Sequence, residues 1–333
     1  TARLTFAGAE CDNQHHWEIG PDTATNNNGE NMFGRRSDGK LVRGLDPIVA
    51  LTPYLMPMRC DAQVMLDYRV DYERLARYIV KKGREGVKIT FTDLLIASYV
   101  RMISQVPELN RFIANKRTYA RTELTCSFVV LQNTRDGSVA ENTTKCKFDP
   151  HDTIYDVSAR VSKAIEESRK EDADNSTMKI ARMLTNPYLA TFIAAVARLL
   201  DRYGLLPRFI IDASPFHTGL FIANMASIGM PAVRHHIYNF GTTSQFVSIG
   251  NVVRTTELTP EGKPYLKRWL PLGVVADERI VAGMVYSQMV TEMIRYLSNP
   301  ELLEEPPETV YWDEGNTYSE PKVPLKKRRR LRT

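Results

Sequence analysis

Cysteine and long apolar runs are scarce in this sequence. Its 333 residues include four cysteines, which are too widely separated for a disulfide framework or a metal knuckle. No stretch reaches the roughly 18 uninterrupted apolar residues of a spanning helix, and no signal-peptide pattern opens the chain. We therefore expect a cytoplasmic protein in a reducing compartment, with no transmembrane segment.

The motifs of several large enzyme classes are also absent. The chain has no G-x-x-x-x-G-K-[ST] loop, no G-x-G-x-x-G after a strand, no H-E-x-x-H and no G-x-S-x-G. His15 and His16 have no third ligand nearby, which favours two solvated side chains over a metal site. The sequence thus gives no support to nucleotide-phosphate, zinc-protease or serine-hydrolase chemistry, and we expect no metal.

The positive charge is concentrated near the C-terminus. The net charge is +5, and the last stretch holds six cations, namely Lys326, Lys327, Arg328, Arg329, Arg330 and Arg332. Without them the chain is nearly neutral. Attraction to nucleic acid or to an anionic surface would therefore come from this tail. A solvated, disordered end is the simpler interpretation of the same residues.

Composition and patterning predict one large body between polar ends. With 43% hydrophobic and 25% charged residues, the chain can bury a sizeable core. Residues 1–47 are rich in turn-forming types and predict an N-terminal arm or linker. Residues 48–305 carry the apolar periodicity, and residues 306–333 predict an extended basic tail.

Within the body, the periodicity predicts strands and helices in a mixed order. Strands are expected at 60–70, 123–133, 218–229, 244–253 and 268–277, and helices at 71–86, 90–105, 151–168 and 285–299. A further helix is expected at 186–209. Its longest apolar run, from Pro187 to Ala197, fits a core or partner-facing helix better than membrane contact.

Several stretches resemble, in family order, the catalytic domain of the 2-oxoacid dehydrogenase acyltransferases, whose fold is shared with chloramphenicol acetyltransferase. They are AQVMLDYRVDYERL, ITFTDLLIASYVRMISQVPELNRFI, TCSFVV, GLFIANMASIG, SIGNVV and LGVVADERIVAGMVYSQMVTEMIRYLSNPELL. The resemblance covers residues 48–305. It implies a two-layer α/β sandwich with a mixed sheet, assembled as a homotrimer from which some members build cages. No lipoyl-bearing lysine domain is apparent upstream, so the chain looks like a free-standing acyltransferase domain.

The resemblance also implies a chemistry, in which an acyl group moves between two thiols or from coenzyme A to a hydroxyl. In the family, a histidine of an H-x-x-x-D-G motif accepts the proton, and a serine or threonine hydroxyl stabilises the oxyanion. On this chain the histidine position falls on Glu278, the motif's acid on Ala282 and the serine on Ala223. All three positions are changed.

Four neighbouring positions keep the family's residues: Asp277, Arg279, Gly283 and Asn224. The resemblance implies that they shape the turn and its salt bridges. It also implies that coenzyme A or an acyl-coenzyme A is the ligand, if one is bound.

Glu278 is a poor replacement for a histidine base. A glutamate titrates about two pH units further from a thiol than a histidine does. Ala223 offers no hydroxyl, and loss of one oxyanion donor costs about 2.7–4 kcal/mol. We therefore favour for Glu278 a salt bridge to Arg279 or to a cation of a neighbouring subunit.

Other candidate groups lie on segments that flank the strand of Ala223. Three are histidines, His217, His235 and His236, which serve either as catalytic or ligand-binding groups or in packing. Thr243 and Ser244 are candidate hydroxyl donors in the same region. Cys126 is a weaker candidate, because an apolar strand disfavours a thiolate.

Two functional hypotheses remain open. The first is a catalytically silent relative, kept as a trimeric or cage-forming scaffold that binds a partner or an acyl ligand through its old channel. The second is an active acyltransferase that uses coenzyme A and a base outside the family pattern, either Glu278 or one of the histidines. The lost positions favour the first.

Overall fold

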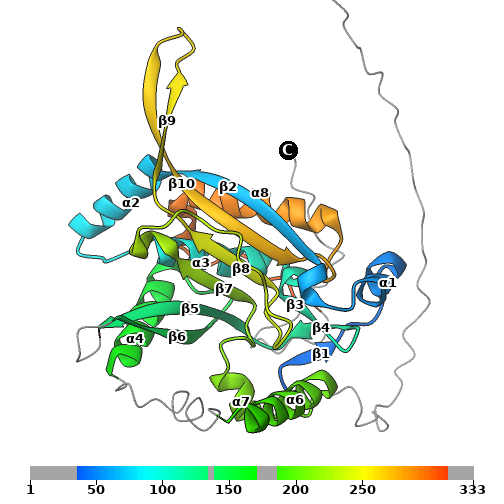
Figure 1. The fold of residues 1–333 in the computed structure, drawn as a ribbon. Helices are drawn as coiled ribbons and strands as arrows, with labels where there is room; N and C mark the ends of the chain where they lie inside the picture. The colour runs from blue at the N-terminus through cyan, green and yellow to red at the C-terminus, as the bar shows by residue number, and fades with distance from the viewer. Residues whose placement is uncertain (1–35, 134–138, 171–185, 314–333) are drawn as a thin grey trace, which may run out of the picture. The chain divides into compact units, whose positions relative to one another are not determined.

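A computed structural model describes residues 36–133, 139–170 and 186–313. The helices are α1 (Pro47–Leu55), α2 (Tyr72–Arg84), α3 (Phe91–Gln105), α4 (Ile154–Lys170), α6 (Pro187–Tyr203), α7 (Arg208–Ala213) and α8 (Gly283–Ser298), with short 3-10 turns at η1 (Arg59–Asp61), η2 (Pro107–Asn110), η3 (Met225–Ile228) and η4 (Pro300–Leu303). The strands are β1 (Gly39–Leu41), β2 (Gln63–Asp71), β3 (Arg111–Ala114), β4 (Arg117–Arg121), β5 (Leu124–Asn133), β6 (Val139–Phe148), β7 (Leu220–Asn224), β8 (Gln245–Ile249), β9 (Val253–Leu258) and β10 (Pro264–Asp277) (Figure 1). His15, His16 and the basic residues 326–332 lie outside the described residues.

Seven of the described strands form one mixed sheet, in the order β2-β10-β8-β7-β5-β6, with β9 paired to β10. Strand β7 runs parallel to β5 and β8, and the other neighbours are antiparallel. The shorter strands β1, β4 and β3 form a separate antiparallel sheet. This topology confirms the mixed α/β class that the sequence predicts.

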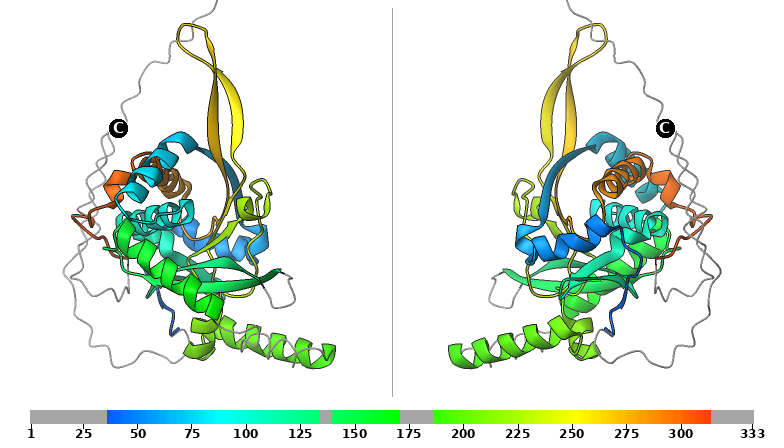
Figure 2. Two further views of the ribbon diagram at one scale, coloured as in Figure 1. Left: turned by 90° about the vertical axis from the view of Figure 1, so that its left-hand side faces the viewer. Right: turned by 90° about the vertical axis from the view of Figure 1, so that its right-hand side faces the viewer.

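Helices α2, α3, α4 and α8 cover one face of the large sheet, as Figure 2 shows. Between the two layers lies the main core, to which β7 and β8 contribute Leu220, Ile222 and Val247. Because side chains alternate along a strand, Phe221 and Phe246 point to the opposite face, where they belong to a smaller apolar cluster. On that side of the sheet lie α1, residues 229–241 and α6 (Figure 2).

Local sequence signals set several helix ends. Asp71 caps α2 by accepting a hydrogen bond from the backbone of Arg74, and Thr90 with Asp93 forms a capping box at the start of α3. Asn186 caps α6, which ends at Gly204 in the left-handed conformation (φ 74°). The three helix starts lie within a few residues of the predicted ones, whereas the single helix predicted at 186–209 is wrong at its end, because α6 stops at Gly204 and α7 begins at Arg208.

The folded body includes residues on both sides of the predicted domain 48–305. Strand β1 pairs with β4. Near the other end, the Arg111 guanidinium donates hydrogen bonds of 2.6 and 2.7 Å to Asp313, and Trp312 is buried. Parts of the expected arm and tail therefore contribute to the packed structure.

Candidate functional site

The turn after β10 is built around a buried ion pair. Arg279 donates two side-chain hydrogen bonds to the carboxylate of Asp277, Nε to Oδ1 at 2.8 Å and Nη2 to Oδ2 at 2.7 Å. Both residues are almost fully buried. Arg59 Nε lies 3.5 Å from Asp277 Oδ2, and the Tyr286 hydroxyl donates to the Asp277 carbonyl. The carboxylate thus holds two buried guanidinium groups in place.

Glu278 takes no part in this pairing. Its backbone N–H donates to Ala62 at 2.9 Å, and no hydrogen bond or ion pair of its side chain occurs among the described residues. The half-buried carboxylate borders a cavity of about 480 Å³ lined mainly by apolar side chains of β2 and α8. Ala282 and Gly283, next along the turn, are the N-cap and first residue of α8. A neighbouring subunit's cation stays a prediction for the partner of Glu278.

Ala223 and Glu278 do not meet within one chain. In the sheet register, Ala223 lies level with Ser248 of β8 and, two strands away, with Gly273 of β10. Glu278 comes five residues after Gly273, directly after the end of β10. The backbone positions of Ala223 and Glu278 are therefore on the order of 15–20 Å apart. The Ala223 methyl packs against the small cluster of Phe221 and Phe246, and the adjacent Asn224 is exposed.

Residues 229–241 lie across the sheet face that carries Ala223. Val233 donates its N–H to Ser248 Oγ at 2.9 Å, and this hydroxyl donates to the Val233 carbonyl at 2.5 Å. The approach needs glycine on the strands beneath, because a Cβ at Gly250 would lie 2.0 Å from Ala232 N and one at Gly273 would lie 2.4 Å from the Val233 carbonyl oxygen. The backbone of residues 229–241 therefore packs directly against the backbone of the strands, with no side chain between them.

The two adjacent histidines lie on this segment and have different surroundings. His235 is half-buried, with its ring stacked on Phe246 at 4.5 Å and Nδ1 2.7 Å from the His236 carbonyl oxygen. His236 is exposed, stacks on His235 at 4.7 Å and meets the Tyr238 ring edge-on at 5.1 Å. His236 lines the cavity described next, whereas His235 packs against Phe246 of the sheet.

That cavity has a volume of about 720 Å³ and a cationic wall. Five cations line it: Arg59, Lys116, Arg198, Arg202 and Arg279. They come from η1, the β3–β4 turn, α6 and the turn after β10. The only carboxylate among its lining residues is Asp201. A concave site of this size and charge attracts an anionic small molecule.

A cysteine and an asparagine meet at the wall of the same cavity. Asn239 Nδ2 donates to the sulfur of Cys60 at 3.3 Å, and its Oδ1 accepts the backbone N–H groups of Arg59 and Cys60 at 2.9 and 3.1 Å. The Cys60 side chain is exposed. A carboxamide has two N–H donors, so one remains for a ligand after the contact with sulfur.

His217 belongs to a buried cluster that fastens the end of α6. Its Nδ1 lies 2.8 Å from Ser214 Oγ and its Nε2 3.3 Å from Asp201 Oδ1, and Arg36 Nη2 donates to the same carboxylate at 2.8 Å. Burial alone would raise the pKa of Asp201, but the His217 hydrogen bond and the Arg36 charge lower it to about 2. These contacts favour packing over catalysis for His217.

The remaining sequence candidates are committed to structural contacts. Thr243 Oγ1 donates to the Phe216 carbonyl at 2.8 Å and Ser244 Oγ to the Arg111 carbonyl at 2.5 Å. Each hydroxyl has one proton, so neither retains a donor for an oxyanion. Burial raises the pKa of the Cys126 thiol well above its usual value, which disfavours the thiolate.

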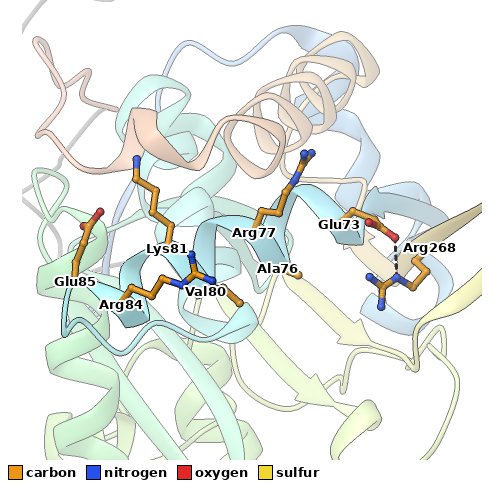
Figure 3. Close-up of a pocket in the computed structure, with 8 residues that line it drawn as sticks. All are labelled: Glu73, Ala76, Arg77, Val80, Lys81, Arg84, Glu85 and Arg268. Atoms are coloured by element: carbon orange, nitrogen blue, oxygen red, sulfur yellow. Dashed lines mark hydrogen bonds and ion pairs between the residues drawn. The ribbon is translucent and has the colours of Figure 1, made fainter.

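A third cavity, of about 490 Å³, lies along one face of α2 (Figure 3). Glu73 and Arg268 meet at one end through a 2.8 Å hydrogen bond, and Glu85 lies at the other end. The cations Arg77, Lys81 and Arg84 lie along the row, with no histidine, cysteine or hydroxyl among the lining residues. It offers charge but no catalytic group.

None of the described His, Cys, Asp and Glu side chains form a group of three or more that could hold a metal ion. None of the described helices is both long and apolar enough to cross a membrane.

Sequence reasoning did not single out the cavity residues Arg59, Cys60, Lys116, Arg198 and Asn239. They come from segments far apart in the chain, so no motif or spacing connects them. The one local signal was the stretch 235–241, HHIYNFG, which concentrates polar and aromatic side chains and includes the candidate histidines His235 and His236.

The fold is similar to solved structures of acyltransferase catalytic cores. The chain is 14% identical to Azotobacter vinelandii dihydrolipoamide acetyltransferase, with a TM-score of 0.49 over 79% of this chain and 94% of that one. The structure of that enzyme comes from a study of the role of a serine, a histidine and an asparagine in its catalytic mechanism. It is also similar to the catalytic core of a 2-oxoacid dehydrogenase complex from Thermoplasma acidophilum (14% identity, TM-score 0.48, 78% and 98% covered).

A chloramphenicol acetyltransferase is similar as well, at 11% identity and a TM-score of 0.44 over 78% of this chain and 99% of that one. These are the proteins that the sequence resemblance names. No protein-family model and no curated protein matches the chain.

Proposed function

We propose that the protein is an acyltransferase that binds an acyl-coenzyme A in the cation-lined cavity and transfers the acyl group to a thiol or hydroxyl. The observation that carries the proposal is one cavity that combines the exposed imidazole of His236 with three cations, Lys116, Arg198 and Arg202, that form no ion pair among the described residues. Coenzyme A presents several phosphate charges, and guanidinium groups are suited to bind them in bidentate fashion.

The other groups at the wall have roles that acyl transfer requires. His236 accepts the proton of the attacking thiol or hydroxyl, because a neutral imidazole has one ring nitrogen with a free lone pair. The second N–H of Asn239 donates to the oxyanion that forms on the thioester carbonyl. The leaving thiolate of coenzyme A then takes up the proton from the imidazolium.

The placement of Glu278 supports His236 rather than Glu278 as the base. The carboxylate borders the apolar cavity between β2 and α8, whereas His236 borders the cationic one. A negative charge next to a developing oxyanion would also oppose the reaction.

A catalytically silent scaffold is the second candidate, favoured by the methyl groups at positions 223 and 282 and by the separation of Ala223 from Glu278. We propose a homotrimer in either case, since the resembling family places its channels between neighbouring subunits. A particle mass equal to about three chains is expected, and a mass of about 24 or 60 chains, typical of the family's cages, would instead favour the container.

Titration with acetyl-coenzyme A and an assay of free thiol release separate the two candidates. We expect Lys116→Ala to weaken acetyl-coenzyme A binding by about tenfold, while Lys81→Ala, on the α2 cavity, leaves it unchanged. His236→Asn should lower turnover by about 10²–10⁴-fold and preserve binding. Glu278→Gln should leave turnover unchanged.

The possible outcomes lead to different conclusions. Binding without turnover against a panel of thiols and alcohols would move the protein to the silent class. Equal turnover of His236→Asn and the unaltered protein would remove His236 as the base. Absence of any binding would refute the assignment of the cavity to coenzyme A.

A further inference from the structure

Cys60 supplies an exposed thiol at the wall of the cationic cavity. Its sulfur accepts a hydrogen bond of 3.3 Å from Asn239 Nδ2, and its S–H group points to Asp61 Oδ1, with sulfur and oxygen 3.6 Å apart. A thiol sulfur has two lone pairs, so one remains after the contact with Asn239. The thiol is therefore oriented by two contacts and keeps an electron pair for a further bond.

The carboxamide of Asn239 is held in one orientation. Its Oδ1 accepts the backbone N–H groups of Arg59 and Cys60 at 2.9 and 3.1 Å, so both Nδ2 hydrogens point to the other side. One hydrogen contacts the Cys60 sulfur, and the other is the oxyanion donor of the proposed function. The sulfur and the oxygen of a bound thioester thus share one nitrogen as their donor.

The shared nitrogen sets the distance between the sulfur and a bound thioester. With N–H bonds about 120° apart, and contacts of 3.3 Å to sulfur and about 2.9 Å to oxygen, the two acceptors lie about 5 Å apart. The carbonyl carbon lies about 1.2 Å from its oxygen, so it approaches the sulfur to roughly 4 Å. Reaction requires about 3–3.5 Å, and a small rotation of the Cys60 side chain closes this difference.

Buried positive charge borders the thiol. Arg59, the preceding residue, and Arg279 both line the cavity and share the carboxylate of Asp277. Arg59 is buried, and its Nε makes no hydrogen bond among the described residues. Two guanidinium groups with one carboxylate leave positive charge in excess. Acyl transfer develops negative charge on the attacking sulfur and then on the oxyanion, and this excess stabilises both.

The other cysteines in the described part of the chain lack this setting. Cys126 and Cys146 lie opposite each other on β5 and β6 and belong to the main core. Burial raises the pKa of the Cys146 thiol to about 12 and that of the Cys126 thiol well above its usual value. The thiolate is the nucleophilic form of cysteine, so burial keeps both residues unreactive.

We propose that Cys60 is a catalytic nucleophile that carries the acyl group as a thioester between the donor and the acceptor. The inference rests on the proposed function and adds to it a covalent intermediate on this chain. It assigns a double displacement in place of direct transfer between two bound substrates.

Both half-reactions use the groups already assigned. In the first, Cys60 Sγ bonds to the acyl carbon and the carbon–sulfur bond of coenzyme A breaks, while the thiol proton passes to His236 and from there to the leaving thiolate. In the second, the acceptor thiol or hydroxyl gives its proton to His236 and attacks the Cys60 thioester. The Cys60 thiolate leaves and takes the proton back. No group is oxidised or reduced.

Acid-quenched samples of the full chain, incubated with acetyl-coenzyme A and no acceptor, test the proposal. We expect the intact mass to rise by one acetyl group, which neutral hydroxylamine removes as it does a thioester, and peptide mapping to place it on Cys60. Cys60→Ala should carry no label and lower turnover by at least about 10²-fold, with acetyl-coenzyme A binding retained. Its unfolding midpoint should be unchanged, since the side chain is exposed. Cys11→Ser, the matched control, should keep both the label and the turnover.

The outcomes separate this inference from the proposed function. Turnover by the unaltered protein without any label, or full turnover by Cys60→Ala, would show direct transfer and overturn the covalent intermediate alone. A label that persists in Cys60→Ala would also overturn the assignment. Steady-state rates at varied donor and acceptor should give parallel double-reciprocal lines, and intersecting lines would contradict a double displacement. Absence of acetyl-coenzyme A binding would instead refute the proposed function, and this inference with it.

Discussion

Removal of the Asp277 carboxylate is expected to destabilise the fold severely. Asp277→Ala deletes the partner of Arg279, which is 2% exposed, and the nearest anion of Arg59, which is 4% exposed. Breaking a buried pair from one side costs about 3–5 kcal/mol, because the remaining charge stays buried without compensation. At about 2–4 °C per kcal/mol, the melting temperature should fall by roughly 6–20 °C.

The neighbouring residue supplies the matched control. Glu278 is half-buried and has no ion pair among the described residues, so Glu278→Gln should change the unfolding free energy by no more than about 0.5 kcal/mol. Urea unfolding of both variants at neutral pH measures the difference. A cost below about 1 kcal/mol for Asp277→Ala would refute the view that this carboxylate holds the turn.

Three other perturbations test separate parts of the structure. Gly250→Ala puts a Cβ 2.0 Å from Ala232 N, so residues 229–241 should shift and acetyl-coenzyme A titration should show weakened binding. Asp201 has a pKa lowered to about 2, so its contribution of about 2 kcal/mol is complete above pH 4 and is lost as pH falls toward 2. Asp201→Asn should therefore flatten the acid limb of unfolding curves, and an unchanged limb would contradict the assignment. A thiol reagent at pH 8, followed by peptide mapping, should label Cys60 in the native protein and Cys126 only after unfolding.

Much of the fold could be predicted from the sequence, because several helices and strands have strong local sequence signals. The cap at Asp71 and the capping box at Thr90 mark helix starts, and apolar runs mark β5, β8 and the second half of β10. Strands β6 and β9 were missed, since VAENTTKCKF and VRTTEL are polar and strand pairing, not composition, places them in the sheet.

The candidate site was less accessible from sequence. The family resemblance directed attention to Glu278 and Ala223, whereas the cationic cavity is assembled from side chains that only the tertiary structure brings together. The helix predicted at 186–209 shows the same limit. Its apolar pattern was compatible with burial or with a partner, and in the structure most of α6 is exposed, with Asp201 held by Arg36 and His217 near the end of the helix.

The length of β10 has a mechanical consequence. Its first half pairs with β9 in a hairpin that projects from the sheet (Figure 1), and its second half lies between β2 and β8 before ending at Asp277. One unbroken hydrogen-bonded rod of 14 residues, about 45 Å long, thus connects the projecting tip to the Arg279 anchor. The projecting hairpin is therefore held to the body by the same strand that ends at the Asp277–Arg279 ion pair.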